Sequence, residues 1–387
     1  MKYKRLQVTF RGSNLASKFV VNFWARPAVK ISGKVEFLLN KYDIGDIKLT
    51  AQDIFVNDSA GIAYPTGIQV SVELWAISKE EAIEKARGWA SGLVSIASFV
   101  SDIGMPSFHV ETAYDLTPNA ESRDFVQFFY DFPIISISNG QLPPELFSDC
   151  FGKLIDGNTK HRDRLQRAIG RYSKSITEAN VIDQFSSIWI GFEALNEALR
   201  EKLNAPDEIS KCPECGHEHH VSTLSGVKHF IIHNSPEGPE LFKRGRRIRV
   251  DILHSTKNLE GILPEIASLV PSLRAELRRA VFFLLDLRDT SPVREQPITN
   301  VIPIFTALEA KIVGAKDVVA LRNDLGGPHI EIMDIHVESH VEQDQTVSFS
   351  VQPKIIARVT DSAKFEVYAS STYRERGKIK SSSFKIP

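Results

Sequence analysis

The residues best suited to chemistry lie in one segment, KRGRRIRVDILHSTKN, which begins at Lys243. Within it, Arg249 and His254 are separated by four residues. A histidine titrates near neutral pH and can therefore donate or accept a proton during a reaction. An arginine guanidinium forms paired hydrogen bonds to phosphate oxygens and stabilises the negative charge that builds up on them. The pair could therefore perform acid–base chemistry on a phosphodiester.

The spacing of this pair sets a geometric condition. Five residues on a straight helix turn about 500°, so Arg249 and His254 lie about 140° apart around its axis. A long arginine side chain can bend toward the same groove. Arg247 lies seven residues before His254, nearly on the same face, and it is the second candidate for the phosphate-binding role.

Basic residues are concentrated around the pair. The whole chain has 47 basic and 48 acidic residues and a net charge of −1, so any contact with nucleic acid must be local. The cluster before the histidine consists of Lys243, Arg244, Arg246, Arg247 and Arg249, and the next expected helix adds Arg274, Arg278, Arg279 and Arg288. This density fits phosphate contacts, and a solvated helix face is the alternative.

A polar insertion at 204–234 carries cysteines and histidines. Cys212 and Cys215 form a CPxCG knuckle whose thiolates suit Zn²⁺. His229 and His233 complete a spacing that is typical of zinc sites, and they share one helical face. The rival partners follow the knuckle directly and are His217, His219 and His220. We expect a structural zinc ion rather than a catalytic one, and no cofactor for catalysis.

An ordered set of residues links the pair to a known family. Trp189 and Glu193 lie upstream in IWIGFEALNEAL, the insertion follows, and RVDILHS then supplies Arg249 and His254. The arginine–histidine spacing resembles the Rx4-6H signature of the HEPN superfamily. The tryptophan and the glutamate–leucine pattern are similar to those of the Apea-like HEPN subgroup. The resemblance covers the helical region from about residue 145 to about residue 290.

The resemblance implies an all-helical bundle that cleaves RNA without a metal ion. It implies that His254 is the general acid/base, that Arg249 stabilises the phosphate, and that Arg244, Arg246 and Arg247 bind RNA. The HEPN site usually forms where two such domains pair, so the resemblance also implies a homodimer. It further implies a role in prokaryotic antiviral defence or as a toxin, with a trigger or partner protein acting through the flanking domains.

One position departs from the family pattern. The residue after the motif arginine is commonly asparagine in HEPN domains, whereas here it is Val250. Some members are not catalytic and use the bundle for dimerisation or RNA binding, and this is the alternative function. An accessory role in a metabolic operon is a third.

The elements that must position these residues form an α+β multidomain chain. Alternation at Ile68, Val70, Val72 and Leu74 predicts strands over residues 1–75. Ser78 begins a capping box that predicts a helix ending by residue 104, and residues 120–150 are interpreted as a connection. The expected domains are an N-terminal α+β domain (1–144), a helical domain (145–291) and a C-terminal β-rich domain (292–387).

The helical region is expected to contain two helices within 158–203 and others at 223–234, 239–257 and 264–288, the last kinked or split at Pro271. Strands are expected within 329–370. No apolar run is long enough to cross a bilayer, and the N-terminal residues lack a signal peptide's apolar core, which predicts a cytoplasmic protein without membrane contact.

Overall fold

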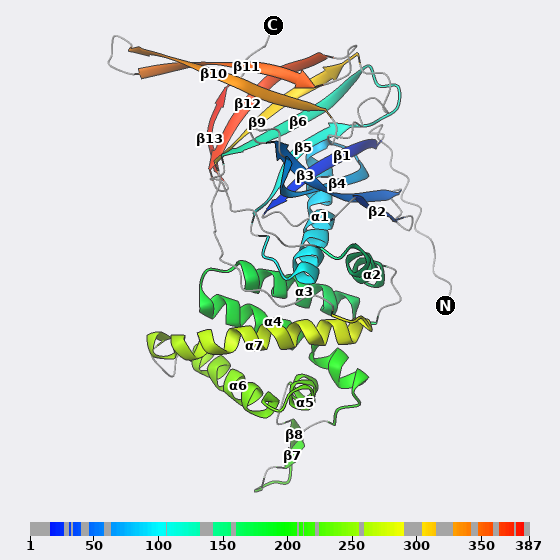
Figure 1. Cartoon of the computed structure of the whole chain (residues 1–387), viewed down its shortest axis with the longest axis vertical. Coiled ribbons are helices and arrows are strands. Elements are labelled where there is room, and N and C mark those ends of the chain that lie inside the picture. Colours follow the sequence, from blue (N-terminus) through cyan, green and yellow to red (C-terminus); the bar gives the residue numbers. More distant parts are fainter. Residues whose placement is uncertain are drawn as a thin grey trace.

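The structure is a computed structural model. It describes residues 16–26, 31, 34–39, 46–57, 63–105, 107–131, 142–155, 160–206, 209–211, 213–220, 224–254, 259–289, 304–314, 328–341, 347–358, 364–374 and 377–382. The chain is an α+β protein in which an antiparallel sheet occupies one end and helices occupy the other (Figure 1).

A nine-stranded sheet has the order β13-β12-β9-β6-β5-β1-β4-β3-β2, and each neighbouring pair is antiparallel. Alternating apolar residues, with Val70, Val72 and Leu74 buried, place one face of β4 in the core. The strands are β1 (Ser17–Arg26), β2 (Lys34–Leu39), β3 (Ile47–Asn57), β4 (Ala63–Ala76), β5 (Ser107–Asp115), β6 (Ser122–Asp131), β9 (Ile304–Val313), β12 (Lys364–Arg374) and β13 (Gly377–Ser382).

The two ends of the chain share this sheet. The sequence places residues 1–144 and 292–387 in separate domains, whereas in the structure β6 pairs with β9 from Ser122 to Asp131. The helical part is therefore inserted between two neighbouring strands. A second ribbon, of β10 (His329–Val341) and β11 (Val347–Arg358), pairs only with itself among the described strands.

The interpretation of residues 120–150 as a connection is wrong over its first and last parts, because Ser122–Asp131 form β6 and Pro144–Ile155 form a helix. Phe125, Val126 and Gln127 are all buried. A strand covered on both faces shows no alternation of apolar and polar residues, so it lacks the usual strand signature.

Seven helices lie in the described residues. They are α1 (Lys79–Ser101), α2 (Pro144–Ile155), α3 (Arg162–Thr177), α4 (Val181–Lys202), α5 (Ser225–Asn234), α6 (Gly238–His254) and α7 (Leu259–Leu285). The expected helices are thus present. Pro264 and Pro271 both lie inside α7, which is not split. No helix in the described part of the chain is both long and apolar enough to span a bilayer.

Helix α1 connects the sheet to the helices. Its predicted capping box is confirmed, because the Ser78 side chain accepts a hydrogen bond from the Glu81 amide at 3.2 Å. The Glu81 carboxylate in turn accepts one from the Ile77 amide at 2.7 Å. The helix packs on β1, β4 and β5 and also contacts α2 and α3, so it crosses from one layer to the other (Figure 1).

A buried arginine ties the end of α1 to the helical part. The Arg278 side chain is fully buried in α7 and donates hydrogen bonds to the carbonyl oxygens of Phe99 and Val100 at the end of α1. It also forms an ion pair with Asp289, with an Nε–Oδ2 distance of 2.7 Å. Burial disfavours the charged form of Arg278, but the hydrogen bond to Asp289 and the interactions with Tyr172, Asp289 and Asp102 together outweigh it and keep the pKa above its ordinary value. Tyr172 of α3 completes the joint by donating to Asp102, which follows α1.

Candidate nucleic-acid interface

Gly245 of α6 faces the ring of Trp189 of α4. A Cβ atom at Gly245 would come within 2.7 Å of Cζ3 of Trp189, so a larger residue would displace the tryptophan ring. Trp189 is buried, and its ring lies 6.2 Å from that of Phe242, one turn earlier on α6. This contact fixes how the two helices meet.

One turn further along both helices, the structure brings Glu193 and Arg249 together. The Arg249 Nε and Nη2 atoms each lie 3.4 Å from Glu193 Oε1. The side chains are 22 % and 41 % exposed, so solvent and larger ligands can reach them. Three members of the ordered set in the sequence, Trp189, Glu193 and Arg249, therefore meet on adjacent helices.

His254 is the last residue of α6. Its side chain lies outside the part of the chain whose side chains the structure describes, so its contact with Arg249 stays a prediction. Its helical position is clear. It follows Arg247 by seven residues and Val250 by four, which puts it on their side of α6, about 140° from Arg249.

Two of the three predicted RNA-binding arginines share one carboxylate. Arg244 Nε lies 3.2 Å from Glu265 Oε1 of α7, and Arg247 contacts the same oxygen. The Arg244 and Arg247 side chains are 35 % and 50 % exposed. Their charges are partly balanced in the free protein, and a phosphate would compete with Glu265 for them.

The third arginine, Arg246, is exposed and lines a groove between α5 and α6 with a volume of about 540 Å³. The cations along this groove are Lys228, Lys243, Arg246 and Arg247. Ile232, Phe242 and Val250 add an apolar surface, and Asp251 is the acid among the described residues that line it. Four cations beside an apolar wall suit a strand of nucleic acid, whose phosphates meet the charges and whose bases meet the wall.

The rest of the basic cluster has other partners. Arg278 is buried in the joint and is not available to phosphate, so its place in the expected basic patch is wrong. Arg274 donates to the Ser175 carbonyl and to Gln184, both at 3.1 Å. Arg279 pairs with Glu276 at 2.8 Å. The sequence alone overestimates the number of arginines available to phosphate, because it does not distinguish a helical arginine that faces solvent from one that faces the core.

Sequence reasoning did not assign Lys228 or Phe242 to this surface. Lys228 belongs to α5, between the two histidines and the cysteine knuckle, and reaches the groove only through the packing of α5 on α6. Phe242 fits the apolar stripe of α6 and is almost fully buried. The spacing of Phe242 and Arg246, four residues apart on one helix, is the local signal that could have indicated a shared face.

Cys215 of the predicted knuckle lies in the turn of a small hairpin, β7 (Ile209–Lys211) and β8 (Glu218–His220), which projects from the helical end (Figure 1). Cys215 is exposed, and Gly216 has a φ of +73°, the left-handed conformation that a tight turn requires. Cys212 lies outside the described residues.

The two histidines of α5 share one face, as the sequence predicts. The rings of His229 and His233 lie 4.2 Å apart between centroids. Among the described residues, which leave out Cys212, no group of three potential ligands is gathered closely enough to hold a metal ion. The set Cys212, Cys215, His229 and His233 therefore stays a prediction. Cys150 is a poor ligand, because burial raises the pKa of its thiol to about 12.

We expect about one zinc ion per chain in protein purified without added metal, measured by elemental analysis. The reason is that two thiolates in a CPxCG turn favour Zn²⁺ over harder cations. Replacing Cys212 and Cys215 together by serine should release the metal. If His229 and His233 are the other ligands, the double alanine variant should also release it, while the His219/His220 double variant should not. Folded protein without zinc would contradict the prediction.

No protein-family model, curated protein or solved structure matches this chain.

Proposed function

We propose that the protein is a metal-independent, HEPN-type endoribonuclease, with His254 as general acid/base and Arg249 stabilising the phosphate. The observation that carries the proposal is the meeting of Glu193 and Arg249, with their nearest atoms 3.4 Å apart. These residues come from two distant segments, and the HEPN resemblance singles out both. The groove between α5 and α6 supplies the cations that an RNA backbone needs.

The reaction uses the RNA's own hydroxyl as nucleophile. A general base removes the proton from the 2′-hydroxyl, whose oxygen forms a bond to the adjacent phosphorus. The bond from phosphorus to the 5′-oxygen breaks, and a general acid protonates that oxygen. The products are a 2′,3′-cyclic phosphate and a 5′-hydroxyl. Arg249 stabilises the charge on the non-bridging oxygens in the transition state, when that charge exceeds the single charge of the Glu193 carboxylate that Arg249 contacts in the free protein.

A homodimer would complete the site. On α6, the arc of about 140° from Arg249 to His254 contains the positions of Leu253, Arg246 and Val250. Val250 and Leu253 are 44 % and 57 % exposed and belong to the few large apolar side chains that the described part of the chain leaves in solvent. Two copies that meet at Leu253 would bury this side chain, leave the groove at Val250 open to RNA, and bring the histidine of one copy toward the arginine of the other.

We expect Leu253→Asp to convert a dimer into a monomer and to reduce RNA cleavage at least tenfold. A carboxylate at the centre of a contact between two copies would be buried without a partner. Light scattering at micromolar concentration measures the mass. The matched control is Leu38→Asp in β2, where the leucine is 62 % exposed at the far edge of the sheet. A wild-type monomer that cleaves RNA would contradict the dimer.

The direct test is incubation of the purified protein with single-stranded RNA in the presence and absence of EDTA. Cleavage should persist in EDTA, provided that the zinc is structural and tightly held, and the fragments should end in 2′,3′-cyclic phosphate. DNA of the same sequence should remain intact because it lacks the 2′-hydroxyl. RNA that stays intact under all conditions would contradict the nuclease.

The second candidate function is a non-catalytic HEPN module for dimerisation or RNA binding. Val250 favours it, because an apolar side chain lines the groove where HEPN domains commonly carry a polar one. Such a protein would bind RNA through the groove and leave it uncut. A role in prokaryotic defence or as a toxin, with the sheet receiving the trigger, rests on family analogy.

A further inference from the structure

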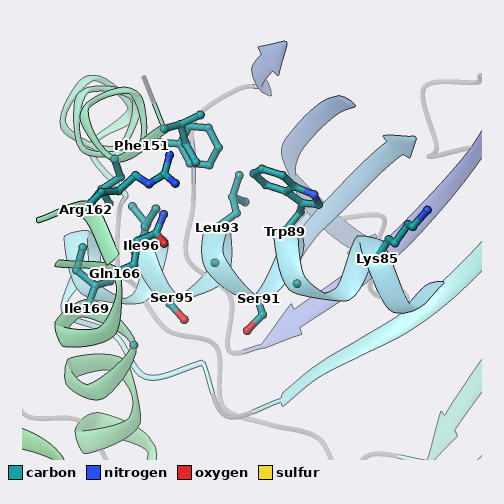
Figure 2. A pocket seen from close by; sticks show the side chains of 15 residues that line it. Lys85, Trp89, Ser91, Leu93, Ser95, Ile96, Phe151, Arg162, Gln166 and Ile169 are labelled. Atoms are coloured by element: carbon teal, nitrogen blue, oxygen red, sulfur yellow. The ribbon is translucent and has the colours of Figure 1, made fainter. Parts of the chain in front are cut away.

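A cavity of about 520 Å³ lies where α1, α2 and α3 meet, at the boundary between the sheet and the helices (Figure 2). Sites for small molecules typically have volumes of roughly 300–1,000 Å³ and combine apolar walls with a few polar groups. This cavity is separate from the groove of α6, because the two share no lining residue.

The walls of the cavity are largely apolar and aromatic. Trp89, Leu93 and Ile96 succeed one another along one side of α1, and Phe151 of α2 faces them across the open space (Figure 2). Ile169 of α3 closes the far end. Trp89 is half-buried and provides a surface on which a flat ring can stack, whereas Phe151 is buried and its ring stacks on that of Phe37, 3.9 Å away between centroids.

The charge of the cavity has one sign. Lys85 and Arg162 line it, and none of the described residues that line it is acidic. Their carboxylate neighbours lie outside the lining: Lys85 Nζ is 2.7 Å from Glu81, and Arg162 Nε is 3.6 Å from Asp163. Arg162 is also the first residue of α3, where the amide groups of the first turn add a partial positive charge. The Gln166 side chain adds a hydrogen-bonding amide beside it (Figure 2).

Three of the residues that line the cavity are glycines. Gly88 and Gly92 of α1 and Gly170 of α3 lie inside helices, and a Cβ atom at any of them would meet no atom within 4 Å. Packing requires Gly191 and Gly245, where a Cβ atom would come within 2.7 Å of a neighbour. It does not require the three glycines of the cavity.

We propose that this cavity binds a small aromatic anion of the size of a nucleoside monophosphate. The anionic group lies against Arg162 and the start of α3, and the aromatic ring lies against Trp89. The glycines leave the room that the ligand occupies. This binding does not depend on the proposed nuclease activity, because it uses other residues and can be measured without RNA.

Isothermal titration calorimetry of the full-length protein with adenosine monophosphate tests the proposal. We expect binding, with at least tenfold weaker binding of adenosine, which lacks the charge, and of octanoate, which lacks the ring. Arg162→Ala should weaken binding of the monophosphate by about 10- to 100-fold, which corresponds to loss of a charged hydrogen bond worth roughly 1.5–3 kcal/mol.

Filling the cavity provides the sharper test. Gly92→Leu and Gly170→Leu should each abolish binding. Gly261→Leu is the matched control for Gly92→Leu, because Gly261 is also an exposed helical glycine with open space at its Cβ position, on α7. Leucine favours helices more than glycine does, so these variants should remain folded, as circular dichroism would verify.

Three outcomes would overturn the proposal. Wild-type protein that fails to bind the monophosphate at millimolar concentration would remove it. Octanoate that binds at least as well as the monophosphate would contradict an aromatic ligand. Binding that survives both leucine variants but is lost in the Lys243→Ala/Arg246→Ala double variant would place the nucleotide in the groove of α6 instead.

Discussion

His254→Ala is expected to lower the rate of RNA cleavage by at least 10²-fold, because general acid–base catalysis contributes about 10² to 10⁴-fold. Arg249→Ala should cause a loss of similar size, since the guanidinium stabilises charge in the transition state and the oxyanion contacts of other enzymes are worth about 10²–10³-fold. Gel analysis of a labelled RNA under single-turnover conditions measures both. Circular dichroism should be unchanged, because Arg249 is partly exposed and its pairing with Glu193 is long.

Arg247→Ala separates the two arginine assignments. Arg247 lies nearly on the face of His254, whereas Arg249 lies about 140° away. If Arg247→Ala abolishes cleavage and Arg249→Ala does not, the phosphate-binding arginine is Arg247 and the mechanism stands. If the Arg249→Ala/His254→Ala double variant cuts RNA at the wild-type rate, the proposed site is wrong. Arg246→Ala, at an exposed position of the groove, should weaken RNA binding and make it less sensitive to salt.

Arg278→Met is expected to destabilise the protein by about 3–5 kcal/mol, the usual effect of breaking a buried ion pair from one side. The change would leave Asp289 without its cation and the carbonyl groups of Phe99 and Val100 without their donor. It would also remove a cation that lies 5.0 Å from the centroid of the Phe282 ring. The free energy of unfolding in urea, followed by circular dichroism, measures the loss.

Two control variants separate the effect of losing a positive charge from the effect of losing it at this buried position. Arg288→Met alters an exposed arginine three residues beyond α7 and should change the free energy of unfolding by less than about 0.5 kcal/mol. Arg278→Lys retains the charge but not the fork of donors, so it should fall between the two. An unfolding curve for Arg278→Met that matches the wild type would contradict the structural role of the joint.

Local patterns in the sequence predict the helices well. The capping box at Ser78 predicts the start of α1, and the apolar stripe through Phe185, Ile188 and Phe192 predicts α4, because each depends on residues a few positions apart. The pairing of β6 with β9 leaves no comparable trace, since the partners are distant in the sequence and β6 is buried on both faces.

The same difference between local patterns and contacts of distant segments applies to the candidate site. The family pattern selects Glu193 and Arg249 as an ordered set, and the structure brings them into contact. The pairing of Arg244 and Arg247 with Glu265 depends on how α7 packs against α6, which no spacing within α6 encodes. For Arg278 the sequence is misleading. Its place in a basic helix predicts an exposed charge, but the side chain is buried against aromatic rings and carbonyl groups.

The insertion of the helices between β6 and β9 has a consequence for synthesis on the ribosome. Asp131 and Ile304 are neighbours in the sheet, yet the entire helical part must be made between them. During that time β6 presents an unpaired edge, and such edges attract the strands of other chains. Because domains tend to fold as units during synthesis, helices that fold early would draw the ends of the insertion together before β9 emerges. Variants that slow the folding of the helices should therefore aggregate during expression, even where the finished protein is stable.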